Sequence, residues 1–118
     1  MENKPIDVYG DGNQTRDFTF ISDIVNATFS AAFSPGAEGK VFNLGGGSRV
    51  KLKEVLSIME KVNGSKIKVN FSGEQKGDVK HTYADTSKAR KILSFNPIVS
   101  VEEGISREME WIKSFYGF

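Results

Sequence analysis

The chain has 118 residues, of which 38% are hydrophobic and 26% charged, and its formal net charge is +1. This length and composition are typical of one soluble globular unit, so we expect residues 1–118 to form a single domain. A net charge so near zero argues against a nucleic-acid-binding protein and against a protein that binds anionic membranes.

The residue types that are scarce narrow the chemistry further. The sequence has no cysteine, which excludes disulfides and thiol catalysis and fits a reducing compartment, so we expect a cytoplasmic protein. With His81 as its one histidine and no carboxylate cluster at ligand spacing, the sequence predicts no metal site. It shows no signal peptide, and no apolar run approaches the ~20 residues of a membrane span.

The first third of the chain predicts two strands and a helix. Residues 6–12 (IDVYGDG) form a short alternating run that ends in a glycine turn, Gly10-Asp11-Gly12, and residues 16–21 (RDFTFI) alternate again, as half-buried strands do. Ser22 or Asp23 is suited to cap the helix that follows. The face of this helix that we expect to pack against a core consists of Ile24, Val25, Thr28, Phe29 and Ala32.

A third strand, a glycine run and a second helix come next. Residues 40–45 (KVFNLG) predict the strand, and Gly45-Gly46-Gly47 follows it. The helix ends at Asn63-Gly64, a pair suited to a helix C-terminus. Its apolar face consists of Leu52, Val55, Leu56, Met59 and Val62.

The last part of the chain predicts one more strand and two more helices. Residues 66–71 (KIKVNF) predict the strand, and residues 81–84 (HTYA) a short extended piece. Asp85 is suited to cap a short helix, and Ser100 with Glu103 forms a capping box for the final helix. The whole pattern predicts an α/β fold, with a small mixed sheet of about four short strands and about four helices.

The order of strand, glycine run and helix raises the possibility of a dinucleotide-binding turn. That turn needs glycine at its first, third and sixth positions. Gly45 and Gly47 satisfy two of them, but Val50 stands at the sixth, where its side chain would block close strand–helix contact. We therefore favour a tight turn, in which glycine tolerates a positive φ, over a cofactor cradle.

Five short stretches in a fixed order are the distinctive feature of the sequence. They are VYGDGNQTRDFTFISDI, VFNLGGG, KGDVKHTYADTSKARKIL, FNP and SVEEGI, the last followed by Trp111. Together they resemble the C-terminal half of the NAD-dependent nucleotide-sugar epimerase/dehydratase family, the extended short-chain dehydrogenases, and especially its UDP-glucose 4-epimerases. The resemblance covers nearly the whole chain.

In that family the N-terminal half carries the glycine-rich NAD loop and the catalytic tyrosine, lysine and serine or threonine. This sequence has no such loop, and Tyr83 and Lys88 lie five residues apart with Asp85 between them, whereas the family's pair lies four apart on one helix. The resemblance therefore implies no catalytic and no cofactor-binding residue here, with NAD as the cofactor of a full-length parent.

The resemblance also implies substrate-binding residues. Arg16 stands where the family's arginine contacts the diphosphate, and Asp17 beside it could orient the guanidinium; the alternative is a surface ion pair. Asp7 and Tyr9 lie in the strand that resembles the uracil-binding segment, and the alternative there is an ordinary edge strand.

A second group of candidates lies after residue 74. Gln75 occupies the position of a second phosphate-binding arginine in the family, so Lys76 is the nearest source of that charge. Asp78 is a further candidate, with a structural loop carboxylate as the alternative. Thr82 would border the sugar, and its small side chain would leave room for an N-acetyl group.

These residues predict the substrate-binding part of a UDP-sugar 4-epimerase that is not catalytic alone. The alternatives are a dehydratase or decarboxylase of the same family, or a free-standing binding module. We expect a UDP-sugar as ligand, bound weakly, and neither nucleic acid nor membrane as partner. Residues 40–45 would expose an unpaired strand edge, which predicts a homodimer or a strand-exchanged assembly.

Overall fold

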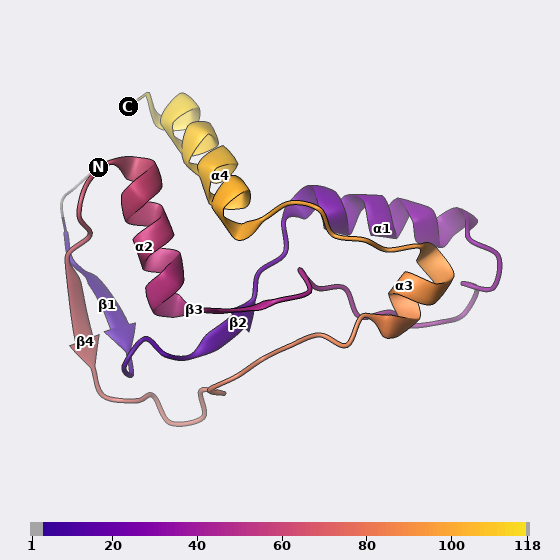
Figure 1. Ribbon diagram of the computed structural model, residues 1–118, viewed down its shortest axis with the longest axis horizontal. Helices are drawn as coiled ribbons and strands as arrows, with labels where there is room; N and C mark the ends of the chain where they lie inside the picture. Colours follow the sequence, from indigo (N-terminus) through magenta and orange to yellow (C-terminus); the bar gives the residue numbers. More distant parts are fainter. Residues whose placement is uncertain (1–3, 118) are drawn as a thin grey trace.

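The structure is a computed structural model that describes residues 4–117. Its elements form a flat molecule with extents of 50 × 37 × 18 Å (Figure 1). In chain order they are β1 (Ile6–Tyr9), β2 (Thr15–Asp17), α1 (Ile21–Phe33), β3 (Arg49–Lys51), α2 (Leu52–Asn63), β4 (Val69–Ser72), α3 (Ser87–Leu93) and α4 (Val101–Tyr116). The predicted α/β fold is confirmed.

The strands form two separate pairs. β1 runs parallel to β4, with Ile6 opposite Val69, whereas β2 runs antiparallel to β3, with Arg16 opposite Val50. An isolated parallel bridge between Thr15 and His81 joins β2 to the later extended segment. Three regions of the chain that are distant in sequence therefore meet near β2.

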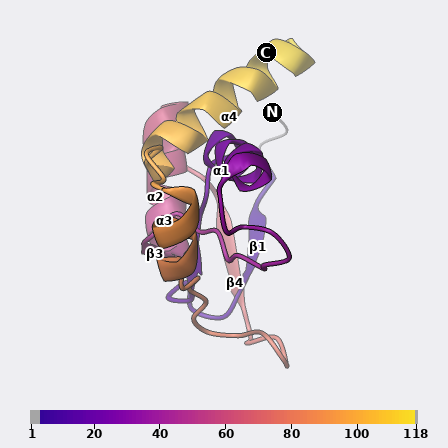
Figure 2. The same cartoon turned by 90° about the vertical axis from the view of Figure 1, so that its right-hand side faces the viewer.

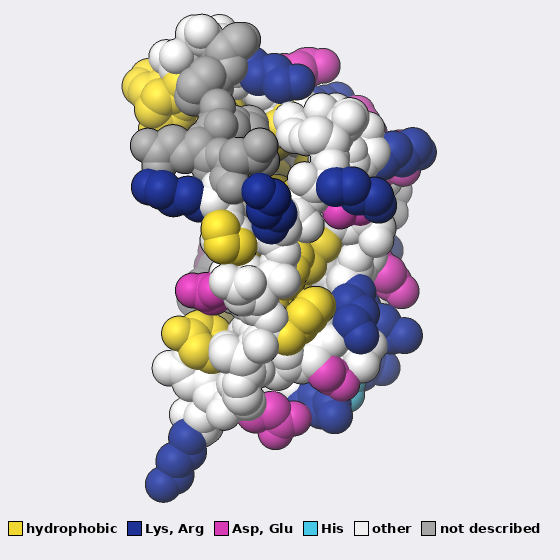
Figure 3. Space-filling view, turned by 90° about the vertical axis from the view of Figure 1, so that its left-hand side faces the viewer, with side chains coloured by type: hydrophobic (Ala, Val, Ile, Leu, Met, Phe, Trp, Pro, Cys, Tyr) yellow, Lys and Arg dark blue, Asp and Glu magenta, His cyan; other side chains and the backbone are white. Residues whose placement is uncertain are grey.

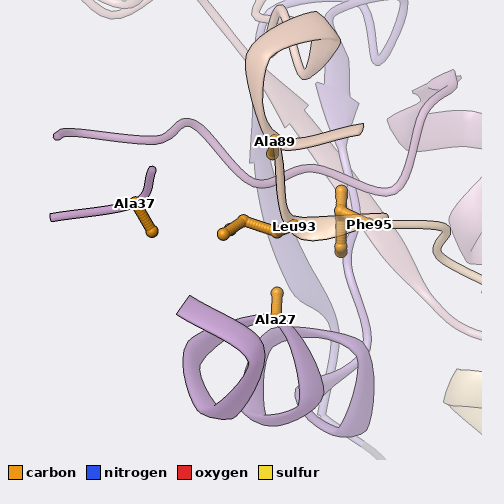
Figure 4. Packing of buried hydrophobic residues seen from close by; sticks show 5 residues of the cluster. All are labelled: Ala27, Ala37, Ala89, Leu93 and Phe95. Atoms are coloured by element: carbon orange, nitrogen blue, oxygen red, sulfur yellow. The ribbon is translucent and has the colours of Figure 1, made fainter. Parts of the chain in front are cut away.

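The helices pack in two places. At one end α2 lies against α4, where Val55 and Met109 are buried. On the surface of that end, single hydrophobic side chains are scattered among lysine, arginine and acidic side chains (Figure 3). At the other end α1 and α3 lie side by side (Figure 2). Between them lies a cluster of buried residues, which consists of Ala27, Ala37, Ala89, Leu93 and Phe95 (Figure 4).

The predicted helix ends are right for two helices. α2 ends at Gly64, whose φ of 70° is left-handed and whose N–H donates to the carbonyl of Glu60. α4 begins after Ser100, whose Oγ accepts from the N–H of Glu103 at 3.2 Å. The carboxylate of Glu103 pairs with Arg107 one turn later, so only half of the predicted capping box is formed.

The predicted cap of α1 is wrong, and that of α3 is displaced by one residue. α1 begins at Ile21, after Phe20, and the carboxylate of Asp23 instead accepts from the N–H of Val99 at 3.2 Å. α3 begins after Thr86, but the Asp85 carboxylate still accepts from the N–H of Ser87, the first residue of the helix, at 3.0 Å. Hydrogen bonding by the side chain and the backbone N–H of Ser87 lowers the pKa of Asp85.

Two further expectations fail. Residues 40–45 form no strand, because a strand needs a neighbour and the described residues place none beside this segment. The face of α1 that was expected to pack inward points outward, since Val25 and Phe29 are exposed. The inward face carries Ala27 instead, which allows α1 to approach α3 closely.

Candidate functional site

A small cleft lies where β1 and β4 end. The two strands are parallel, so their carboxyl ends meet at one edge and the loops that follow them come together there. The main chain ties these loops, as the N–H of Gly10 donates to the carbonyl of Ser72 at 3.0 Å. The cavity has a volume of about 80 Å³. Its lining residues are Tyr9, Gly10, Asp11, Gln14, Glu74, Gln75, Asp78 and Lys80.

Arg16 is anchored beside this cleft. Its Nη2 donates to the Oδ1 of Asp78 at 2.6 Å, and its Nη1 donates to the carbonyl of Thr15 at 2.9 Å and to that of Lys80 at 3.5 Å. Asp78 and Lys80 both line the cavity, so the guanidinium that contacts them lies next to the cavity. The Arg16 and Asp78 side chains are 33% and 44% exposed, which leaves the ion pair open to solvent and to a ligand.

The expected role of Asp17 is wrong. Neighbouring residues of a strand point to opposite faces, so Asp17 turns away from Arg16. Its Oδ1 accepts from the N–H of Gly46 at 2.7 Å, and its Oδ2 accepts from that of Ala84 at 3.3 Å. Asp17 therefore fixes the glycine run, whereas Asp78 orients Arg16.

The glycine run is packed against protein atoms. A Cβ at Gly46 would overlap the carbonyl oxygen of Phe18, and one at Gly45 would lie 2.8 Å from the Cβ of Ala84. Gly47 has a φ of +83°, as expected for a tight turn. Because Asp17, Phe18 and Ala84 fill the space at Gly45 and Gly46, these residues do not fit a dinucleotide cradle.

The remaining predicted site residues lie outside the cleft. Asp7 accepts a hydrogen bond from Asn70 of β4 at 3.2 Å. Lys76 is exposed and is not among the lining residues. Thr82 borders a separate hollow with Gly45 and Tyr83. The structure thus brings Tyr9, Gln75 and Asp78 together, with Arg16 beside them, and leaves the other three apart.

Sequence reasoning missed several cleft residues. Lys80 lies at a bend directly before the bridge between His81 and Thr15, and no motif pointed to it. Gln14 contacts β1, since its Nε2 donates to the carbonyl of Tyr9 at 3.0 Å. No motif marked Glu74 or Asp11.

The charges of the cleft are mixed. Asp11, Glu74 and Asp78 line it together with Lys80, and Arg16 adds a second cation at its border. The backbone N–H and the side chain of Asn13 donate to the Asp11 carboxylate and lower its pKa, so Asp11 is negative at neutral pH. An anion entering the cleft would meet repulsion as well as the attraction of Arg16.

Other chemistries find little support among residues 4–117. That part of the chain holds no group of three His, Cys, Asp or Glu side chains able to bind a metal ion. Tyr83 and Lys88 do not act as a pair: the Arg49 guanidinium lies 5.7 Å from the Tyr83 ring centroid, whereas Lys88 donates to the carbonyl of Val41. None of the described helices combines the length and apolarity needed to cross a bilayer.

The fold is that of the C-terminal portion of the extended short-chain dehydrogenases. The structure resembles Bacillus cereus UDP-glucuronic acid 4-epimerase in complex with UDP-glucuronic acid and NAD, with a TM-score of 0.90 and 38% identity over 98% of this chain and 37% of that one. It also resembles Thermotoga maritima UDP-glucose 4-epimerase with UDP-glucose, with a TM-score of 0.88 and 26% identity over 97% and 36% of the two chains.

The family itself follows from sequence comparison. The model for GDP-mannose 4,6 dehydratase matches residues 1–109, and the chain belongs to that family. It is 42% identical to the UDP-glucuronate 4-epimerase of Thermodesulfobacterium geofontis, over 95% of this chain and 34% of that protein. It is 35% identical to the uncharacterized UDP-glucose epimerase YtcB of Bacillus subtilis, over 98% and 37%. The chain thus spans about a third of these relatives' length, and the resemblance inferred from the sequence is confirmed.

Proposed function

We propose that this chain is the substrate-binding portion of an NAD-dependent nucleotide-sugar 4-epimerase, that its ligand is a UDP-sugar, and that it is not catalytic alone. The observation that carries the proposal is the Arg16 guanidinium, held by Asp78 beside a cleft that Tyr9 and Gln75 line. The named relatives support it, since they include UDP-glucuronate and UDP-glucose epimerases and were solved with UDP-sugars.

The chemistry of the cleft suits a diphosphate held chiefly by one arginine. The planar donors of Arg16 match phosphate oxygens, and the Lys80 ammonium and the Gln75 amide add donors at the cleft. The negative charges of Glu74 and Asp78 repel a doubly charged diphosphate group. We therefore expect weak binding of UDP, with a Kd near millimolar, or about −4 kcal/mol.

NAD enters this proposal only through a larger protein. Bacillus cereus UDP-glucuronic acid 4-epimerase was solved with NAD, but the glycine run of this chain does not fit a dinucleotide. The chain by itself is expected to show no epimerase activity and no heat of NAD binding by calorimetry, and saturable micromolar binding would contradict the proposal.

Titration with UDP, followed by NMR, tests the site directly. We expect chemical shift changes at Tyr9, Arg16 and Gln75. Arg16→Lys keeps the charge but loses the two-pronged donor geometry, so it should weaken binding about as much as Arg16→Ala. Arg107→Ala removes another exposed ion pair, on α4, and should leave UDP binding unchanged. Shifts confined to residues outside the cleft, or none, would refute the assignment.

A nucleotide-sugar dehydratase is the second candidate. The description of the matching family model, GDP-mannose 4,6 dehydratase, favours it. A UDP-sugar epimerase and a GDP-mannose dehydratase differ in the base that the cleft would accept, so parallel titrations with UDP and GDP separate these two. Tighter binding of UDP supports the epimerase, and tighter binding of GDP the dehydratase.

A further inference from the structure

A second cavity lies at the amino ends of β1 and β4, whereas the cleft lies at their carboxyl ends. There the two strands begin beside the end of α2 and the second half of α4 (Figure 1). The cavity has a volume of about 460 Å³, against about 80 Å³ for the cleft, and falls in the roughly 300–1,000 Å³ range of small-molecule sites. We call it the α2–α4 cavity. Its lining residues are Lys4, Ile6, Met59, Asn63, Ser65, Lys66, Ile67, Lys68, Met109 and Ile112.

The wall of the α2–α4 cavity is aliphatic. Met109 is 7% exposed and Ile6 is 41% exposed, so the apolar lining extends from the interior to the surface. Two methionines contribute to it, and their unbranched side chains adapt to a flexible chain. The lining residues include no aromatic ring, and the Nδ2 of Asn63 donates to the Oγ of Ser65 at 2.6 Å, so these two polar side chains are already paired. This lining suits an aliphatic body rather than a nucleobase.

The charges that line the α2–α4 cavity are all positive. Its lining residues include three lysines and no aspartate or glutamate, whereas three carboxylates line the cleft. The Nζ of Lys66 donates to the Oε2 of Glu60 at 2.7 Å, so this ammonium is already paired. No carboxylate among residues 4–117 pairs with the ammonium of Lys68. Lys68 therefore offers one cation at the edge of an apolar cavity, which suits a monoanion.

Hydrogen bonds fix the segment that carries Lys68. The Oε1 of Glu60 accepts from the N–H of Ile67 at 3.0 Å, and the carbonyl of Lys68 accepts from the N–H of Ile6 at 2.8 Å. Hydrogen bonds from the Lys66 side chain and from the Ile67 N–H lower the pKa of Glu60, so its carboxylate stays negative at neutral pH. Residues 66–68 are thus held between α2 and β1. A cavity formed in advance loses little affinity to reorganisation on binding.

We propose that the α2–α4 cavity binds an aliphatic carboxylate of medium chain length. Its chain lies against Met59, Met109 and Ile112, and its carboxylate accepts hydrogen bonds from the ammonium of Lys68. This site goes beyond the proposed function, because it shares no residue with the cleft. Strands of four residues, roughly 13 Å long, separate the two sites, so both ligands can be bound at once.

Titration of the chain with decanoate, followed by NMR, tests the site. Below the critical micelle concentration we expect saturable shifts at Met59, Ile67, Met109 and Ile112, with a Kd below about 1 mM. Acetate carries the charge without the chain, and decyltrimethylammonium carries the chain with the opposite charge. Each should bind at least about tenfold more weakly than decanoate, because each lacks one of the two contributions. Binding of the cation as tightly as decanoate would overturn the proposal.

Two variants separate the charge from the cavity. Lys68→Glu should weaken decanoate binding about tenfold, since it replaces attraction by repulsion. Lys91→Glu, at an exposed lysine of α3 outside the cavity, is the matched control and should change nothing. Ile112→Trp fills the cavity and should also weaken binding, while signals outside the cavity stay unchanged and show that the fold is kept. If that variant does not fold, Lys68→Glu still decides, and equal binding by Lys68→Glu and Lys91→Glu would overturn the proposal.

Other occupants of the cavity would show themselves in the same experiments. Decanoate shifts spread over exposed apolar residues elsewhere would mean detergent-like binding, and competition with UDP would mean a shared site. Binding to phosphatidylglycerol vesicles that Lys68→Glu abolishes would assign the cavity to a membrane lipid, and a dimer that Ile112→Trp dissociates would assign it to a second copy of this chain. Each of these results overturns the proposal. Decanoate shifts at the cavity without any UDP shifts would support it and refute the proposed function.

Discussion

The glycine turn and the cleft lie on either side of β2, and they are built in opposite ways. At the turn, Gly45 and Gly46 are pressed against Phe18 and residue 84, and the Asp17 carboxylate accepts two backbone N–H groups. At the cleft, the Arg16–Asp78 pair is partly solvated and the loop that carries Asp78 is exposed. The adjacent residues Arg16 and Asp17 thus have different roles: Arg16 is available to a ligand, whereas Asp17 stabilises the glycine turn.

This contrast shows how a motif can mislead. The glycine run is the most conspicuous pattern in the sequence, but the space beside its glycines is occupied by Asp17, Phe18 and Ala84 of the same chain, not by a cofactor. The cleft carries no conspicuous pattern, because its side chains come from the ends of β1 and β4 and from an exposed loop. Substitutions on the two sides of β2 should therefore differ in what they change.

The largest effect is expected at the turn. Gly46→Ala places a Cβ on the carbonyl oxygen of Phe18, which cannot move without disrupting β2. We expect a loss of about 3 kcal/mol or more in the free energy of unfolding, measured by urea denaturation. Gly73→Ala is the matched control, since nothing lies within 4 Å of its added Cβ. Equal stability of the two variants would show that the turn relaxes freely.

The carboxylate that holds the turn should have the next largest effect. Asp17→Asn replaces one acceptor oxygen by an amide, so it leaves one of the Gly46 and Ala84 N–H groups unpaired. We expect about 1–3 kcal/mol of destabilisation by the same measurement. Asp7→Asn, at an exposed position of β1, should cost far less. A smaller loss for Asp17→Asn than for Asp7→Asn would contradict the role assigned to Asp17.

On the other side of β2 the effect on stability should be small. Asp78→Asn removes the charge opposite Arg16, but the pair is exposed to solvent, so we expect a change of at most about 1 kcal/mol in the free energy of unfolding. The same variant should alter the NMR signals of the Arg16 side chain, which loses its partner. A loss of stability as large as that of Asp17→Asn would mean that the cleft is as structural as the turn.

The smallest effect is a pH dependence at the cleft. Hydrogen bonds from Asn13 lower the pKa of Asp11 below its ordinary 3.8. A carboxyl group whose pKa is lower in the folded state stabilises the fold at pH values above its unfolded-state pKa. This contribution is lost as the pH falls through its folded-state pKa. Asp11→Asn should therefore reduce the drop in melting temperature between pH 7 and pH 3. An unchanged or larger drop would contradict this account.

The parts of the fold that could be predicted are those decided by local chemistry. Gly64 ends α2 and Ser100 begins α4 because each cap depends on residues within one turn of it. The face of α1 and the strand at 40–45 were predicted wrongly for a common reason. Both depend on what lies beside them in space, and periodicity only shows that an apolar face exists, not what covers it.

The candidate site divides in the same way. Arg16 was identified from its motif, but its partner was not, because Asp78 lies 62 positions away and only the bridge between β2 and residue 81 brings them together. The alternation rule for strands already argued against Asp17 as that partner. Lys80 was missed because the backbone hydrogen bonds of Thr15 with Lys80 and Thr82 place it at the cleft, and these long-range contacts leave no pattern in the sequence.

The loop at 73–79 is fastened at both of its ends by main-chain contacts. At one end the carbonyl of Ser72 accepts from Gly10, and at the other the carbonyl of Lys80 accepts from Thr15 at 2.9 Å. Side chains play no part in these two attachments, and every residue between them is exposed. Apart from Asp78, which holds Arg16, and Gly77, whose φ of 91° favours glycine, residues 73–79 can therefore be exchanged as a cassette without disturbing these two attachments. A library of such loops on an unchanged frame would present new side chains to the same cleft.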